Sequence, residues 1–151
     1  MGVNQQYLQY GGDLMVFVGT GSTKYPVAFS TTAKLSVSMK TRDISSKDSG
    51  DWVEKAAGKF DWNASTDALT SFSATGSTYS VEDLYGYMVA KCPVNIAFGK
   101  RCGTTPSWAL CTSSKYFSGS AIITAMDLTA SDQETSTFSV SFEGNGILSI
   151  T

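Results

Sequence analysis

AKLSVSMKTRDISSKDSGDWVEKAAGKFDWNAS, residues 33–65, is the segment from which the rest of the predicted fold follows. Its first nine residues alternate between apolar and polar side chains, and so do its last six. Strict alternation is typical of a strand with one buried face. We therefore predict two antiparallel strands joined by the intervening residues. The predicted buried face consists of Leu35, Val37, Met39, Phe60, Trp62 and Ala64.

The connection between these strands, residues 42–58, is long and mostly polar. Compact domains rarely retain such a connection unless it has a function or is disordered. It carries charges of both signs and one large aromatic residue, Trp52, and an aromatic flanked by charges is a typical contact anchor. We predict a projecting loop that contacts a partner. The candidate contact residues are Arg42, Asp43, Ser45, Ser46, Lys47, Asp48, Asp51 and Trp52.

The remaining strands are predicted from apolar runs and alternation between turn residues. Pro26 favours an edge strand, and Gly119 favours a bulge. Residues 1–12 are expected to form an N-terminal arm, residues 70–79 a loop, residues 99–114 an irregular segment and residues 144–146 a turn. The predicted strands are residues 14–18, 25–29, 94–98, 116–129, 135–143 and 147–150.

One helix is predicted, at about residues 80–91. Ser80 is a suitable N-cap, and Glu82 and Asp83 lie in the first turn, where the helix dipole favours negative charge. This position explains the two acids better than a catalytic pair does. Pro93 disfavours a helical residue before it, so the helix ends there. With one helix and strands in antiparallel pairs, the chain is mainly β. We expect one domain, residues 1–151, forming a β-sandwich or partly open barrel with a flanking helix.

Composition excludes several functional classes. Charged residues make up only 16% of the chain and the net charge is −2, whereas nucleic-acid binders usually carry a basic face. Low surface charge suits a protein with extensive subunit contacts, but composition alone slightly favours a Ser/Thr-rich β domain. Because histidine is absent, Ser-His-Asp and Cys-His catalysis are excluded. Residues 19–24 resemble a phosphate loop, but the order of Lys and Ser/Thr is wrong, so we predict a hairpin turn.

No cofactor or metal is predicted. Asp43, Asp48 and Asp51 lie close together in sequence, but their spacing matches no EF-hand, and Lys47 lies among them. Three cysteines without histidine or a CxxC motif make a poor zinc site. A Cys102–Cys111 disulfide is one alternative, and a reduced cytoplasmic chain is the favoured one. The N-terminus has no signal-peptide pattern, and no apolar run is long enough to span a bilayer.

The chain resembles the major tail (tail tube) proteins of long-tailed bacteriophages and prophages. The resemblance lies in residues 28–32 (AFSTT), 35–38 (LSVS) and 43–52 (DISSKDSGDW). It continues in residues 116–124 (YFSGSAIIT) and 137–146 (TFSVSFEGNG). The segment SSKDSG, residues 45–50, is the most specific part, and residues 99–114 have no counterpart.

The resemblance implies a non-enzymatic virion protein that forms six-subunit rings stacked into a tube. It implies that the loop at residues 42–58 reaches the neighbouring ring, that viral DNA passes through without tight binding, and that no membrane is involved. It further implies a tail terminator, a tape measure and baseplate or tip proteins as partners. A candidate lumen face is formed by Lys34, Ser36, Ser38, Lys40, Asp61, Asn63 and Ser65.

Two alternatives remain open at this stage. The inner tube of a contractile tail, a tailocin or a type VI secretion system shares the same fold logic. A carbohydrate-binding β-sandwich that uses Trp52 and Trp108 belongs to a different class. The first differs from a non-contractile tail by its sheath, and the second predicts a monomer with saturable glycan binding.

Overall fold

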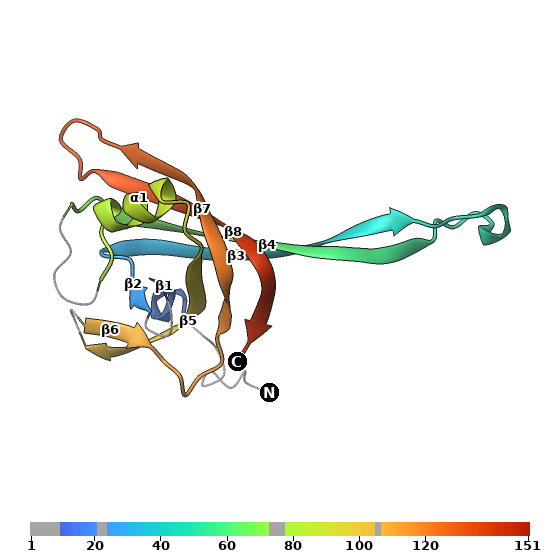
Figure 1. Cartoon of the computed structure of the whole chain (residues 1–151), viewed down its shortest axis with the longest axis horizontal. Helices are drawn as coiled ribbons and strands as arrows, with labels where there is room; N and C mark the ends of the chain where they lie inside the picture. The colour runs from blue at the N-terminus through green and yellow to red at the C-terminus, as the bar shows by residue number, and fades with distance from the viewer. Residues whose placement is uncertain (1–9, 21–23, 73–77, 105–106) are drawn as a thin grey trace, which may run out of the picture.

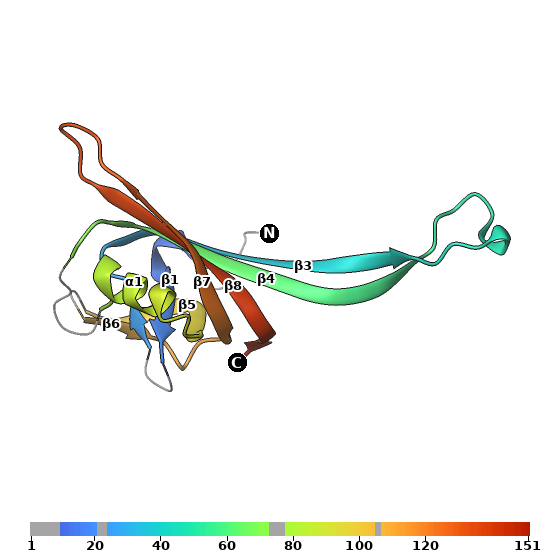
Figure 2. The same cartoon turned by 45° about the horizontal axis from the view of Figure 1, so that its top comes forward.

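The computed structural model describes residues 10–20, 24–72, 78–104 and 107–151 of the chain. Within them, eight strands form one antiparallel sheet that is not closed into a barrel, and a single α-helix packs against it. Figures 1 and 2 show a curved body from which one hairpin extends far beyond the other elements. The predicted mainly β class with one flanking helix is therefore confirmed.

The strand order in the sheet is β2-β1-β5-β7-β8-β4-β3, with β6 paired to β5. The first four strands are β1 (Leu14–Gly19), β2 (Tyr25–Pro26), β3 (Ser30–Asp43) and β4 (Lys55–Leu69). The others are β5 (Val94–Thr104), β6 (Ser107–Leu110), β7 (Phe117–Thr129) and β8 (Thr137–Ile150). Two short 3-10 helices, η2 (Gly11–Asp13) and η3 (Lys47–Ser49), and the helix α1 (Val81–Val89) complete the described elements. As predicted, Pro26 lies in an edge strand.

The core lies between the curved sheet and α1. Val81 and Leu84 of the helix pack with buried residues of five strands, including Val16, Ile96 and Phe142. The helix begins where the sequence predicts, because the Asp83 carboxylate accepts hydrogen bonds from the Ser80 backbone N–H and hydroxyl, both at 3.0 Å. Within the described residues, no helix is long and apolar enough to cross a membrane.

Two predicted segments differ from the structure. Residues 99–114 were expected to be irregular, yet β5 continues to Thr104 and pairs with β6. The predicted turn at residues 144–146 is instead a bulge inside one continuous strand, β8. Gly146 has φ +95°, a conformation that glycine adopts without strain in either a turn or a bulge, so local sequence cannot distinguish the two. The predicted bulge at Gly119 corresponds to a register shift between Gly119 and Ala121, but the extra residues lie on β8, between Gly144 and Leu148. Residues 1–9 of the predicted N-terminal arm lie outside the described residues.

Candidate functional site

The most distinctive feature of the molecule is the hairpin formed by β3 and β4. Strand β4 pairs with β8 only as far as Asn63, which lies opposite Glu143. Beyond that point β3 and β4 continue together, away from the body, to a tip that contains η3 (Figure 1). We call residues 37–62 the arm. The predicted loop at residues 42–58 is therefore shorter than expected, because the strands themselves extend to Asp43 and Lys55.

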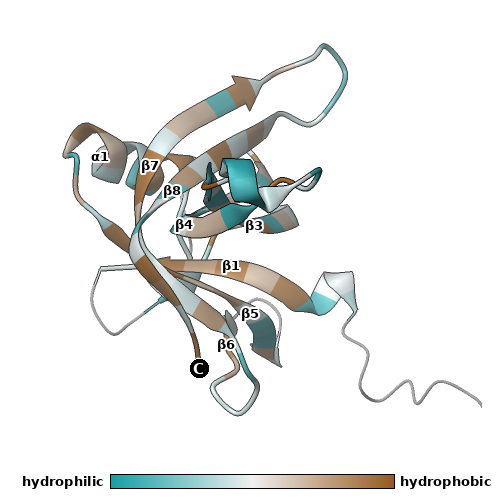
Figure 3. Ribbon diagram, turned by 90° about the vertical axis from the view of Figure 1, so that its right-hand side faces the viewer, coloured by the Kyte–Doolittle hydropathy of each residue, from teal (hydrophilic) through white to brown (hydrophobic). Residues whose placement is uncertain are grey.

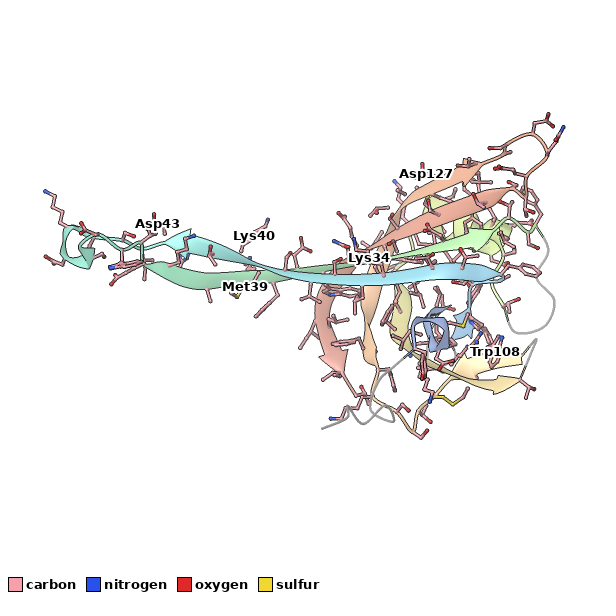
Figure 4. The ribbon with its side chains drawn as sticks, turned by 180° about the vertical axis from the view of Figure 1, so that it is seen from behind. Lys34, Met39, Lys40, Asp43, Trp108 and Asp127 are labelled. Carbon is pink, nitrogen blue, oxygen red and sulfur yellow. A yellow bond between two sulfur atoms is a disulfide. The ribbon has the colours of Figure 1, made fainter. Side chains whose placement is uncertain are left out.

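One face of the β3–β4 hairpin is polar. Lys34, Ser36 and Ser38 lie directly opposite Ser65, Asn63 and Asp61 in the β-sheet register. The Ser38 hydroxyl also donates to the Asp61 carbonyl oxygen at 3.4 Å. Figure 4 shows Lys34 and Lys40 on the same side of the ribbon. The seven residues proposed from the sequence as one face are thus brought together, and their role as a lumen face stays a prediction.

The opposite face of the arm is apolar and exposed. Leu35 packs against the core and Trp62 is buried, as predicted, but Val37, Met39 and Phe60 are 55%, 44% and 74% exposed. Figure 4 shows Met39 on the side of the ribbon opposite Lys40. The predicted burial of these three side chains is wrong for the single chain, because the arm extends past the body that would cover them. Alternation identifies an apolar face, but it does not identify what covers that face.

The tip of the arm is ordered by its own hydrogen bonds. The Asp43 carboxylate accepts a 2.8 Å hydrogen bond from the Ser45 N–H, and the interaction with Ser45 lowers the pKa of Asp43. The Ser45 hydroxyl accepts from the Glu54 N–H at 2.8 Å, which joins the two ends of the turn. Ser46 and Ser49 form a capping box around η3. Asp43, Ser45 and Ser46, predicted as contact residues, therefore also hold the shape of the tip.

The other predicted contact residues are presented to solvent. Arg42, Lys47, Asp48 and Asp51 are exposed, and Trp52 has 83% of its side chain exposed. In Figure 3, which looks at the molecule from the side of the arm, the short helix η3 is strongly hydrophilic. Trp52 is thus a large apolar side chain within a polar and internally braced tip. This arrangement suits a contact anchor, and that role remains a prediction.

A second cluster lies at the opposite side of the body. Cys102 and Cys111 form a disulfide across the β5–β6 hairpin, so the favoured expectation of a fully reduced chain is wrong and the alternative pairing holds. The Arg101 guanidinium lies 4.1 Å from the ring centroid of Trp108 and 3.9 Å from the Asp13 carboxylate. The contact with Asp13 connects the hairpin to η2, directly before β1. Among the described residues, no group of three or more His, Cys, Asp or Glu side chains could hold a metal ion.

Solved structures with the same fold are components of tails and injection devices. The tail of an empty gene transfer agent particle, refined with C6 symmetry, aligns with a TM-score of 0.75 at 18% identity, covering 95% of this chain and 99% of that one. The SPP1 tail tube aligns with a TM-score of 0.68 at 8% identity, covering 94% of this chain and 78% of that one. The tube-terminating cap of the anti-feeding prophage aligns with a TM-score of 0.58 at 14% identity, covering 91% and 87%.

Sequence comparison gives a sharper result than the shared fold. No curated protein matches the chain significantly. The phage tail tube protein family, in contrast, matches residues 9–150, which include both strands of the arm, the helix and the β7–β8 pair. Because this match covers nearly the whole chain, the protein belongs to the phage tail tube family.

Proposed function

We propose that the chain is the major tube subunit of a virion tail, and that six copies form a ring that stacks with others into a tube for viral DNA. The observation that carries this proposal is the arm. It exposes an apolar face and an apolar anchor beyond the body of the subunit. Exposed apolar surface of this kind marks an interaction site, and head-to-tail copies can close into a ring.

The arm offers two different contact surfaces. Its stem presents Val37, Met39 and Phe60 next to the body, and its tip presents Trp52 at the far end. In a stack of rings, the tip reaches the neighbouring ring, and the charges of Arg42, Lys47, Asp48 and Asp51 set the register between rings. Exposed ion pairs contribute little individually, so Trp52 carries most of the free energy of this contact.

The polar face of the β3–β4 hairpin is our candidate for the lumen wall. It carries two lysines, Lys34 and Lys40, and one acid, Asp61, among small polar side chains. Tight binding of DNA requires many Lys or Arg contacts to phosphate, and this face offers few. DNA would therefore pass along it without being held. This role needs no cofactor and no catalysis, which agrees with a structural family.

The tube requires partners at both ends and inside. We propose a tail terminator at one end, baseplate or tip proteins at the other, and a tape measure protein in the lumen. A solved tube-terminating cap with the same fold supports a terminator as one of these partners. The subunit is then a component of the virion tail, made in the host bacterial cytoplasm.

Negative-stain microscopy of the purified chain tests the proposal. We expect six-fold rings, tubes, or both. Deletion of residues 45–51 should prevent stacking while circular dichroism shows an intact β fold, because the tip packs on no part of the core. If the deletion variant stacked into normal tubes, the tip would not be the contact between rings. If the intact chain stayed monomeric at high concentration, the tube proposal would fail.

A contractile system is the second candidate. A sheath/tube terminator of an extracellular contractile injection system shares the fold at a TM-score of 0.58 and 12% identity, which supports the inner tube of a contractile tail, tailocin or type VI-like device as this alternative. A neighbouring sheath gene would favour it. The carbohydrate-binding alternative loses its shared platform, because Trp52 lies between η3 and β4 at the arm tip, whereas Trp108 lies in β6 on the body beside Arg101 (Figure 4).

A further inference from the structure

The arm leaves the sheet at a fork, and Trp62 fills that fork. Asn63 is the last residue of β4 that pairs with β8. At the next residue the strands separate, and the indole of Trp62 lies over β7 and β8 instead of pointing to solvent, with only 4% of it exposed. Its Nε1–H donates a 3.0 Å hydrogen bond to the carbonyl oxygen of Gly146.

Two glycines make room for the indole. A Cβ at Gly119 would lie 2.7 Å from the Trp62 ring, and a Cβ at Gly144 would lie closer still. The β8 bulge, in which Gly146 has φ +95°, places the accepting carbonyl beside the indole nitrogen. Close packing against Gly119 and Gly144 therefore fixes the position of the indole ring, and the hydrogen bond to Gly146 fixes its orientation.

The length of the arm magnifies any change of angle at this point. From Trp62 to Lys55, β4 spans about 23 Å at about 3.3 Å per residue, so a rotation of about 10° at the fork moves that end by about 4 Å. A displacement of that size separates side chains that must meet on a neighbouring copy. Beyond Asn63, β3 is the one strand that pairs with β4 in the part of the chain that the structure describes.

We infer that Trp62 is a positioning residue for assembly, which sets the angle between the arm and the sheet through its contacts with the glycine-lined bulge. The inference rests on the proposed tube function for its biological meaning, but the angle itself is a property of the single chain. If Trp62 only filled the core, weakening its contacts would lower stability without changing the direction of the arm.

The angle between the arm and the sheet can be followed by double electron–electron resonance, which measures the distance between two spin labels. The labels are placed at Lys47→Cys on the arm tip and Asp127→Cys on β7, in a Cys92→Ser background. The labelled chain is diluted with unlabelled chain so that intramolecular distances dominate. We expect one narrow distance distribution with Trp62 present. Trp62→Phe keeps a ring over the glycines but removes the N–H donor, and it should shift the mean by several Å or at least double the width.

Two further variants make the result decisive. Val81→Ala, a buried change on α1 beside Ser71, beyond the end of β4 that is remote from the fork, should leave the distribution unchanged. Gly144→Ala displaces the indole without altering Trp62, and it should broaden the distribution even if Trp62→Phe does not fold. An unchanged distribution in a folded Trp62→Phe or Gly144→Ala protein, or equal broadening in Val81→Ala, would overturn the inference.

Microscopy of the same unlabelled variants separates this inference from the proposed function. We expect Trp62→Phe to form rings but fewer and shorter tubes than the parent chain. If the parent chain formed neither rings nor tubes, the proposed function would fail, while the distance measurement would still test the role of Trp62. Normal tubes from Trp62→Phe would show that the fork does not control assembly.

Discussion

Trp52 and Trp62 are the same residue type ten positions apart, yet their exposed fractions are 83% and 4%. Their different surroundings could be predicted from neighbouring residues. Trp62 occupies an apolar position of an alternating strand, and Trp52 lies among charges in a connection. The contacts that fix Trp62 could not be predicted, because the glycines beneath its indole ring, Gly119 and Gly144, lie on β7 and β8, far from Trp62 in sequence.

Replacing Trp52 tests the contact anchor at the scale of one residue. Trp52→Ala should change the free energy of unfolding by less than about 0.5 kcal/mol, because the side chain is exposed. It should raise the concentration needed for stacking by about ten-fold or more, which corresponds to the loss of a contact hot spot. Light scattering and microscopy provide the measurement. Lys47→Ala, also at the tip, is the control and should have little effect. An equal effect of both variants would contradict the assignment of Trp52.

Tyr79 gives the fold a dependence on alkaline pH. Burial, together with a hydrogen bond to Tyr87, raises the pKa of Tyr79 to about 12. The unfolded chain loses this proton near pH 10, so stability is complete below about pH 10 and falls as pH rises towards 12. Urea midpoints at pH 9 and pH 11.5 should therefore differ less in Tyr79→Phe than in the parent chain. An identical decline in both proteins would show that Tyr79 is not responsible.

At the scale of elements, prediction succeeded where the signal is local. The helix α1 is predicted by Ser80, Asp83 and the helical spacing of Val81 and Leu84. The capping contacts are then made by Ser80 and Asp83. Prediction failed at β8, because Gly144 and Gly146 are compatible with a turn and with a bulge. The choice is made by Trp62, which needs a glycine surface beneath it. The local sequence pattern does not predict a contact between segments that lie far apart in sequence.

The arm shows the same limit in another form. The sequence predicts two strands and a polar connection, and the register confirms that Leu35, Val37 and Met39 lie opposite Ala64, Trp62 and Phe60. It does not predict where the body ends and the arm begins. That boundary is set by the last pair between β4 and β8, a contact about eighty residues apart in sequence.

The β5–β6 hairpin yields a prediction about stability. Its disulfide joins residues that are nine positions apart, and the chain-entropy account gives about 2–3 kcal/mol for a loop of this size. Cys102→Ser combined with Cys111→Ala should lower the free energy of unfolding by up to that amount in urea. Cys92→Ser is the matched control, since the Cys92 thiol is free and exposed. No difference between the double variant and the control would mean that the hairpin is held by Arg101 and Trp108 instead.

At the scale of the whole molecule, the open strand edges and the exposed arm have one physical consequence. Among the described residues, β3 is an edge strand along its full length, and β8 is unpaired on one side beyond Glu143. Such edges favour association unless they are protected. In a closed ring, each subunit would cover the strand edges and apolar surface of the next subunit. Surface that is exposed in the single chain would then be buried in the ring.

The two faces of the arm should then respond differently to substitution. Met39 and Phe60 lie opposite each other and are exposed, so Met39→Ser combined with Phe60→Ser should leave the monomer folded. If a neighbouring copy buries both side chains, their loss weakens each contact by about 2 kcal/mol or more, or about thirty-fold in affinity. Assembly should therefore need a much higher concentration, as measured by light scattering and negative-stain microscopy.

Lys34→Ser combined with Lys40→Ser is the matched change on the polar face. If that face lines a water-filled lumen, these variants should still form tubes at the parent concentration, because neither lysine would be buried between subunits. The opposite pattern, with assembly lost through the lysines and retained without Met39 and Phe60, would reverse the assignment of the two faces. In that case the apolar face would line the lumen. Exposure of Phe60 to water and DNA there is unfavourable, so we expect the polar face, not the apolar one, to line the lumen.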